Sequence, residues 1–588
     1  MVTLVKFRVE AAYPVPSLPE GKQMIRMQNP PRHCFPIILA LLVVLGTALG
    51  SETSTLNGRP YLKAVTAFAH TVLERGRDKY GAIQTPLFVD GLQVETLEPV
   101  RWQGSSNEVW VLSNFASQQP LMRVLDGLSA VTGDKQYREA AEAAARYVLA
   151  HLRSPSGLPY WGGHTAWDLQ GDRAVGQQGT NNHELKSHQP YYELMWRVDP
   201  AATRQLIEAI WATHILDWER LDYNRHANNQ RRLKPAWDHP FAENIPVPYP
   251  AKGENLSFVN VIPPLMHSGV MLATLGRDDN ALTWTRRLVY RWQQGRDPKT
   301  GLCGGQLSYR TTDRAFQALG HVHPNINEAK IVATYHQTCR YHNLPLAQMQ
   351  AGEELLAAGG RAAELGREFI RWAAEDLLTY ARQCYDPTQG VFIARMTDGT
   401  PLDWKQSRKG YYIPESFAPQ PPDGFLFWGL ATAYRLTRNE THWQSLGQLA
   451  RQFDLGELGQ PSGQQQALRF NTTHQDWRTL YALLELRTAT GNDAFLRLAS
   501  RVADNLLATQ TQTGLFPHEE RTYARTGDEI PLALLHLAVA LDGKPAALPR
   551  PCFDSRFFHC QYYGPLEPHQ QKRADPRTYD DLVFYGAK

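Results

Sequence analysis

The sequence predicts a mainly α-helical protein built from an array of helical hairpins. Apolar residues recur with the 3.6-residue period of a buried helix face, for example at residues 61–75. Short polar turns, such as those at residues 132–134 and 490–493, separate pairs of such helices. A closed ring of hairpins would bury both apolar faces of each pair. We expect an (α/α) toroid of about seven pairs, with minor β structure in its loops, although the irregular spacing of the hairpins does not fix their number.

The expected hairpins follow one another at irregular intervals along the chain. One spans residues 121–152, breaks at residues 132–134 and restarts at Asp134, a residue type that favours the N-cap. Another helix begins at Asp199 and is expected to continue to Trp218. Further polar breaks between apolar helices lie at residues 275–278, 437–440 and 490–493. Long polar stretches, where functional residues tend to lie, occupy residues 161–190, 223–260 and 301–327.

The N-terminus has the pattern of an export signal. Residues 35–49 form an apolar run that follows basic residues and ends in small ones, and the run is shorter than the roughly 20 residues that span a bilayer. An uncleaved anchor is the alternative, and Met24 or Met27 is an alternative start. We expect a signal peptide at 1–50, a toroid at 51–548 and a C-terminal extension at 549–588 that packs on the toroid. The mature protein should be periplasmic or secreted, away from the membrane.

The charge composition gives no reason to expect a nucleic-acid partner. The chain has 61 Lys and Arg against 58 Asp and Glu, and no long basic run. An acidic ligand would therefore have to be held by local cations. The cysteines are scattered and indicate no disulfide framework, although Cys552 and Cys560 are close enough in sequence to pair. We expect a monomer.

The densest group of ionisable residues is NNHELKSH at residues 181–188. Imidazole and carboxylate groups bind first-row divalent metals, and His164, Glu184 and His226 lie on three segments of this region. The spacing of these three residues alone is a weak indication of a metal site, because ligands spread over about sixty residues form no compact motif.

Four long and uncommon strings stand out along the chain. They are TPLFVDGLQVET at 85–96, WGGHTAWD at 161–168, the run from NHELKSH to DYNRH at 182–226, and ALGHVHPNINEAKIVATYHQ at 318–337. These strings resemble family 2 of the polysaccharide lyases, the periplasmic pectate lyases, over nearly all of the mature chain. The resemblance implies ring closure of the toroid and cleavage of polygalacturonate by metal-assisted β-elimination, which gives 4,5-unsaturated oligogalacturonides.

The resemblance also implies a metal site and an arginine that acts where a base is needed. Carried over residue by residue, the metal ligands would be His164, Glu184 and His226. The catalytic residue would be Arg225. His183 and His188 are alternatives to His164. The cofactor would be a divalent transition metal of the Mn, Co, Ni or Zn class, with Mn favoured.

The chemistry of β-elimination accounts for these residue types. The C5 proton of galacturonate is α to a carboxylate, and a divalent cation on that carboxylate stabilises the enolate-like intermediate. Arginine normally stays protonated, so its residue type alone favours an electrostatic clamp over a base. A nearby metal charge would favour loss of the proton. Lys186, His188 and Tyr223 are rival bases, and a surface salt bridge is the non-functional alternative for Arg225.

Other polar residues have less specific interpretations. Five residues are expected to contact substrate: Lys186, His188, Arg314, His321 and His323. The last three belong to a cluster with Glu328 that could equally be a hydrogen-bonded loop joining two hairpins. Trp102, Trp161 and Trp167 could stack on sugar rings or lie in the core.

Two alternative functions remain open. One is a toroid glycoside hydrolase on an acidic polysaccharide, using paired carboxylates drawn from Asp168, Asp172 and Glu193. The other is a non-catalytic toroid that binds polysaccharide.

Overall fold

The computed structural model describes most of the chain beyond the expected signal peptide. The described residues are 57–104, 108–161, 165–176, 183–185, 189–252, 256–312, 314–334, 343–403, 405, 417–517, 522–543, 546–551 and 562–565. They all belong to one structural unit, Thr55–Lys588. The expected signal peptide, its apolar run and the pair Cys552 and Cys560 lie outside the described residues.

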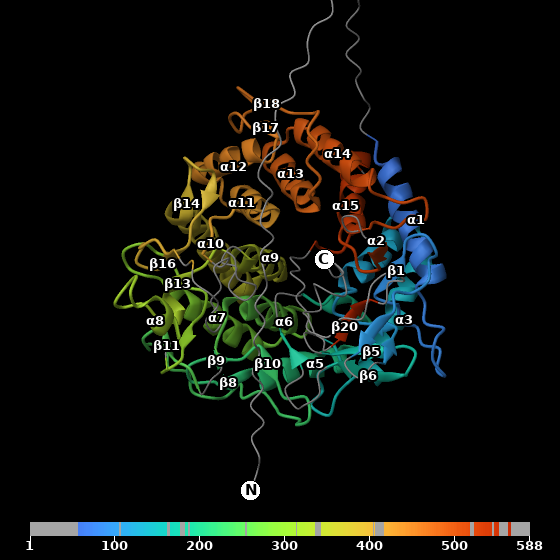
Figure 1. Cartoon of the computed structure of the whole chain (residues 1–588), viewed down its shortest axis with the longest axis horizontal. Helices are drawn as coiled ribbons and strands as arrows, with labels where there is room; N and C mark the ends of the chain where they lie inside the picture. The colour runs from blue at the N-terminus through green and yellow to red at the C-terminus, as the bar shows by residue number, and fades with distance from the viewer. Residues whose placement is uncertain are drawn as a thin grey trace, which may run out of the picture. The chain divides into compact units, whose positions relative to one another are not determined.

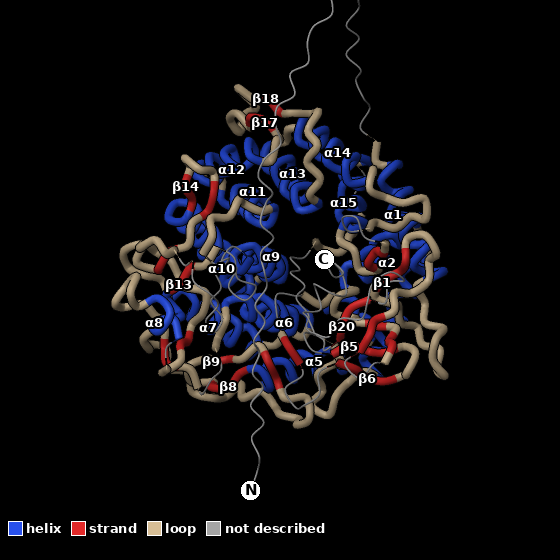
Figure 2. Tube along the Cα trace, in the orientation of Figure 1, coloured by secondary structure: helices blue, strands red, loops and turns tan. Residues whose placement is uncertain are grey.

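Fourteen of the fifteen α-helices in the described residues form an inner and an outer layer (Figures 1 and 2). The inner helices are α2 (Gln119–Thr132), α4 (Tyr192–Val198), α6 (Ile262–Leu275), α9 (Asn343–Ala358), α11 (Gly424–Thr437), α13 (Trp477–Thr490) and α15 (Ile530–Asp542). The outer helices are α1 (Arg59–Arg75), α3 (Lys135–His151), α5 (Pro200–His214), α7 (Asp279–Gln294), α10 (Gly360–Cys384), α12 (Glu440–Gln452) and α14 (Ala494–Leu507). The short helix α8 (Arg314–Leu319) lies in the connection between α7 and α9.

The helices close into a ring of seven hairpin pairs. Each inner helix packs on an outer one, and the last helix, α15, packs on the first, α1. Around the inner layer α6 packs on α9, α9 on α11, α11 on α13, α13 on α15 and α15 on α2. Inner helices such as α15 (IPLALLHLAVALD) are apolar on nearly every side, whereas outer helices carry one apolar face. The structure therefore confirms the predicted (α/α) toroid of about seven pairs.

The two ends of the ring differ in their connections. An inner helix leads to the next outer helix through one to three residues, as between Val198 of α4 and Pro200 of α5. The connections from outer to inner helices are long and contain β1 to β19, together with the 3-10 helices η1 (Val259–Val261) and η2 (Glu328–Lys330). The loops consequently gather at the N-terminal ends of the inner helices, which is where a site on this scaffold is expected.

The strands are short and confirm the prediction of minor β structure in the loops. The described residues contain seven two-stranded pairs, all antiparallel except β11 with β12. They are β1 (Gly91–Gln93) with β19 (Tyr523–Arg525), β7 (His183–Glu184) with β10 (His226–Ala227), β8 (Ile215–Asp217) with β9 (Asp222–Tyr223), β11 (Tyr249–Pro250) with β12 (Ser308–Tyr309), β13 (Ile331–Val332) with β16 (Arg395–Met396), β14 (Tyr385–Asp386) with β15 (Val391–Phe392), and β17 (Gly456–Glu457) with β18 (Ala467–Leu468). Two antiparallel sheets have three strands each. In the first, β5 (Thr165–Asp168) lies between β4 (Leu112–Ser113) and β6 (Arg173–Gly176). In the second, β2 (Trp102–Gly104) lies between β20 (Tyr562–Pro565) and β3 (Val109–Trp110).

The helix starts predicted from Asp134 and Asp199 are confirmed. The Asp134 carboxylate accepts a hydrogen bond from the Gln136 N–H at 3.0 Å, and Asp199 accepts one from Ala202 at 2.9 Å. The predicted end of the second helix is wrong, because α5 stops at His214 rather than Trp218. The backbone turns into strand β8 there, since pairing with β9 satisfies backbone groups that a longer helix would have used.

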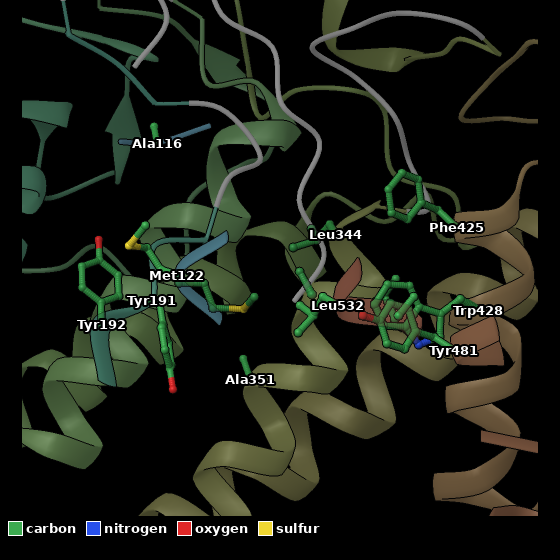
Figure 3. Packing of buried hydrophobic residues seen from close by; sticks show 14 of the residues in the cluster. Ala116, Met122, Tyr191, Tyr192, Leu344, Ala351, Phe425, Trp428, Tyr481 and Leu532 are labelled. Carbon is green, nitrogen blue, oxygen red and sulfur yellow. The ribbon is translucent and has the colours of Figure 1, made fainter. Parts of the chain in front are cut away.

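The interior is filled by large side chains from the inner helices (Figure 3). Trp428 of α11 stacks on Tyr481 of α13, with ring centroids 4.7 Å apart. Trp102 and Trp161 are 0% and 2% exposed, so the core interpretation holds for these two tryptophans. None of the helices in the described part of the chain combines the length and apolar character required to cross a membrane.

The chain beyond α15 returns between the inner helices. Arg550 Nε lies 2.8 Å from Glu354 Oε1 of α9, and Arg550 Nη1 donates to the Gln350 carbonyl at 3.0 Å. The Gln350 amide in turn donates to the carbonyl of Pro551 at 2.8 Å. Residues 549–551 are thus held against α9, and further along β20 pairs with β2 at the loop end.

Two buried histidines of the inner layer are held in the neutral form. His267 of α6 donates from Nε2 to the carbonyl of Pro190, and His536 of α15 donates to the carbonyl of Pro549, each at 3.0 Å. Burial lowers the pKa of each from 6.5 to about 4.

The free energy of unfolding should therefore fall as the pH drops from 6.5 to about 4. In that range the unfolded chain takes up protons at these histidines and the folded chain does not, at a cost of up to about 3 kcal/mol for each. Urea unfolding at pH 7, 5.5 and 4 measures the decline. His267→Gln, whose amide can still donate to Pro190, should show a shallower decline, and an unchanged one would contradict the assignment.

Candidate active site

Strands β7 and β10 bring two predicted ligands to one place. Their antiparallel register sets His226 directly opposite Glu184, so both side chains lie on the same face of the pair. His226 Nε2 is 3.5 Å from Glu184 Oε1, and Arg225 Nε is 3.3 Å from the same oxygen. The backbone N–H of Leu185 donates to the carbonyl of Arg225 at 2.7 Å. The local pairing therefore assembles Glu184, Arg225 and His226 as one cluster.

The three side chains differ in their exposure. Glu184 is 0% exposed, Arg225 16% and His226 27%. A buried carboxylate needs a compensating charge, which Arg225 supplies. The guanidinium also lies over the ring of Phe258, 5.6 Å from its centroid, and Phe258 directly precedes η1 and α6. The cluster is therefore buried on the Glu184 side and open on the His226 side, at the loop end of the ring.

His183 points to the other face of β7. Neighbouring residues of a strand alternate between faces, and His183 lies opposite Ala227. His183 Nδ1 lies 2.9 Å from His214 Nε2, and His214 Nδ1 lies 2.7 Å from the carbonyl of Asn224. A carbonyl only accepts, so neutral His214 donates from Nδ1 and accepts from His183. His183 therefore holds β7 to the end of α5, on the face away from Glu184, and the geometry does not favour it as the third ligand.

Several other predicted site residues lie outside the described residues. They are His164, Lys186 and His188. The rival base Tyr223 is described: its side chain is 0% exposed, and its hydroxyl donates to the carbonyl of Phe258 at 3.0 Å. That contact supports the segment under Arg225, so Tyr223 is a structural residue.

The second polar cluster joins two loops. His323 Nε2 is 3.2 Å from Asp398 Oδ2, which links the connection before α9 to the connection before α11. His321 is exposed, and Arg314 begins α8. Arg310 and Glu328 form a buried ion pair of 3.3 Å, with side chains 4% and 1% exposed. These contacts fit the loop-joining interpretation of His323 and Glu328, while substrate contact by Arg314, His321 and His323 stays a prediction.

Replacing Arg310 by methionine should lower the free energy of unfolding by about 3–5 kcal/mol, because it leaves the Glu328 carboxylate buried without that partner. The double variant Arg310→Met/Glu328→Gln should regain a large part of the loss. Denaturant unfolding of the two variants tests this pair, and equal stabilities for both would contradict it.

The donor atoms of the cluster fit a metal site. Two ligands about 2.1 Å from a tetrahedral ion have donor atoms about 3.4 Å apart, close to the 3.5 Å between Glu184 Oε1 and His226 Nε2. Among the described residues no group of three or more His, Cys, Asp and Glu side chains is placed to hold a metal. The expected third ligand, His164, is outside those residues, so the three-ligand set stays a prediction.

The sequence interpretation missed His214 and Phe258 as supports of the cluster. The signal for His214 was its place at the end of an outer helix, shortly before the Arg225-His226 pair. Phe258 gave no separate signal, since its contact with Arg225 depends on how the loop before α6 folds back.

Comparison with known sequences identifies the protein as a polysaccharide lyase. The family model described as periplasmic pectate lyase matches residues 85–561, and the chain belongs to this family. Pectate disaccharide-lyase of Dickeya dadantii (strain 3937) is 27% identical over 538 residues, which cover 85% of this chain and 93% of the relative.

Solved structures with a similar backbone include two other proteins. The GH76A α-1,6-mannanase of Salegentibacter sp. HEL1_6 is 11% identical, with a TM-score of 0.36 over 82% of this chain and 99% of that one. Cellobiose 2-epimerase of Bacillus thermoamylovorans B4167 is 10% identical, with a TM-score of 0.37 over 68% of this chain and 90% of that one.

Proposed function

We propose that this lyase cleaves polygalacturonate by metal-assisted β-elimination and releases 4,5-unsaturated oligogalacturonides. The single observation that carries the proposal is the cluster in which Arg225 and His226 contact one oxygen of buried Glu184. Family membership and the pectate disaccharide-lyase relative support the choice of substrate.

Glu184, His226 and His164 would hold the divalent metal, with Mn favoured. When bound, this ion would supply Lewis-acid stabilisation of the substrate carboxylate as the C5 proton leaves. Glu184 lies on the closed side of the cluster, so it holds its partners in place without reaching the substrate. His226, which is partly exposed, faces the side from which substrate enters.

Arg225 is the proposed base that takes the C5 proton. A guanidinium normally stays charged, so the role of base requires that Arg225 first give up a proton. The positive charge of a divalent ion held by Glu184 and His226, next to Arg225, would favour that loss. The Arg225 proton would pass to solvent, the C5 proton would then take its place on the guanidine, and the O4 substituent would leave and take up a proton from solvent.

The position of the cluster suits a polyanionic substrate. The loop end of the ring lies at the N-terminal ends of the inner helices, where the aligned backbone dipoles favour negative charge. These dipoles would add to the charges of Arg225 and of the metal.

The glycoside hydrolase alternative is less well supported by the geometry. Asp168 is 3% exposed and accepts hydrogen bonds from the backbone N–H groups of Val111, Gln170 and Gly171. Asp172 accepts one from Ile83. Both carboxylates therefore organise loops.

The deciding experiment measures polygalacturonate turnover with and without a chelator. Elimination gives a conjugated product, so ultraviolet absorbance should rise with time and the rise should stop when the metal is removed. New reducing ends without absorbance would favour a hydrolase. Binding without turnover under any divalent metal would favour a non-catalytic protein.

We also propose that the chain is exported by residues 1–50 and acts as a monomeric toroid, with residues 549–588 as its C-terminal extension. N-terminal sequencing of the mature protein tests the cleavage site, and light scattering tests the monomer.

A further inference from the structure

A cationic cleft lies beside the outer helix α5 and shares no lining residue with the candidate active site. It has a volume of about 380 Å³, which is within the range of small-ligand sites, and we call it the Arg232 cleft. Its charged lining consists of Arg153, Arg232 and Lys234, against the single carboxylate of Glu208. Gln205 adds a polar side chain and Trp237 an aromatic wall.

The cations of the cleft come from two segments that the fold brings together. Arg153 follows α3, whereas Arg232 and Lys234 lie in the connection between β10 and α6. The N–H of Ser156 donates to the carbonyl of Asn229 at 3.2 Å, which joins the two segments. Burial and then the nearby charge of Arg232 lower the pKa of Arg153. Arg153 and Arg232 are therefore near enough to repel each other.

The charge of Asp199 offsets part of this repulsion at Arg153, and Arg153 Nη2 donates a hydrogen bond to Gln205 Oε1 at 3.0 Å. Among the described residues, neither Arg232 nor Lys234 has a carboxylate within ion-pair distance, and Glu208 is 3.7 Å from Arg204. A second arginine-rich cleft, between α7 and α10, differs in this respect. There Arg286 forms a two-pronged ion pair with Glu368, and Arg371 pairs with Glu375. An anion in the Arg232 cleft would relieve repulsion that Asp199 relieves only in part.

The aromatic wall of the cleft is rigid. The ring of Trp237 packs against those of Trp211 and Trp218, with centroids 5.4 Å apart in both cases. The carbonyl of Trp237 accepts a hydrogen bond from Trp284 Nε1 at 2.8 Å. A fixed, partly exposed aromatic side chain beside cations can contact the apolar face of a sugar ring while the cations bind its carboxylates.

We propose that the Arg232 cleft is a second binding site for an acidic oligosaccharide, separate from the candidate active site. The choice of a uronate ligand rests on the proposed function, whereas the cleft and its charges do not. Five residues separate His226 from Arg232, so the Cα atoms of these two residues lie at most about 22 Å apart. A polymer engaged at the candidate active site can therefore reach the cleft, and the second contact raises its affinity through effective concentration.

The test counts binding sites for trigalacturonate by calorimetry. The Arg225→Ala variant, which should not turn the ligand over, is expected to bind two molecules. Arg232→Ser/Lys234→Ser in that background should bind one, because each lost charge-assisted contact weakens the cleft by about tenfold or more. Arg361→Ser/Arg367→Ser, which removes the same charge from the cleft between α7 and α10, should still bind two. Should Arg225→Ala fail to fold, chelated wild-type protein replaces it.

Two further ligands define the chemistry of the site. Methyl-esterified trigalacturonate should not occupy the cleft, and sulfate at the same concentration should not displace trigalacturonate. Displacement by sulfate would show a simple anion site and overturn the proposal, as would an unchanged count in the Arg232/Lys234 variant. The absorbance assay on wild type reports the proposed function separately, so either proposal can fail while the other stands.

Discussion

Replacing Arg225 by alanine is expected to lower kcat on polygalacturonate by about 10³-fold, the contribution typical of a positioned base. The KM should change far less, because the proton-transfer interaction is made in the transition state. An electrostatic clamp would give the opposite split, with KM raised and kcat largely kept. Initial rates from ultraviolet absorbance over a range of substrate concentrations separate the two roles. Added guanidine should restore part of the lost kcat if a guanidine group takes the proton.

Two controls keep this result interpretable. Alanine at Arg225 also leaves the Glu184 carboxylate without its guanidinium partner, so thermal unfolding must show that the variant is folded. Arg220→Ala removes an exposed arginine from the preceding turn and should retain wild-type kcat. A folded Arg225→Ala protein with near-normal kcat would exclude the proposed mechanism.

Replacing His226 by alanine is expected to remove both metal and activity. Loss of a metal ligand should weaken metal affinity by at least about 100-fold, the upper effect seen when supporting residues are changed. Metal content after dialysis, and a titration of the apo-protein with Mn²⁺, give a readout that does not depend on turnover. Excess metal should restore part of the activity, because Glu184 is retained.

His239→Ala is the matched control for the metal prediction. His239 is an exposed histidine of the same connection, and its ring contacts the carbonyl of Pro240. This variant should bind metal as wild type does. If His226→Ala keeps full metal affinity, His226 is not a ligand, whatever happens to its activity.

Helix starts and hairpins could be predicted because their causes are local. The Asp134 and Asp199 carboxylates accept hydrogen bonds from backbone N–H groups two and three residues further on. Both partners of each hydrogen bond therefore lie within one short stretch of sequence. The end of α5 could not be predicted in this way. Its helical pattern continues to Trp218, but pairing between β8 and β9 ends the helix at His214.

The residues of the candidate site could likewise be indicated from the sequence, whereas their contacts could not. Arg225 and His226 were predicted from a resemblance, together with Glu184, which is far from them in sequence. Their shared contact at one carboxylate oxygen depends on the register of β7 and β10, which no local pattern contains. The same register turned His183 away toward His214, so an alternative that the sequence left open became much less favourable.

The sequence by itself determined the class of fold, since the apolar period of the helices and the capped turns between them are properties of neighbouring residues. Through long shared strings it also indicated the family. Tertiary structure alone decided that the ring closes between α1 and α15, that Glu184 is buried beside Arg225, and that Arg153 and Arg232 line one outer cleft. The physical reason is that charges and packing faces from distant segments interact only when the backbone brings them within a few ångströms of each other.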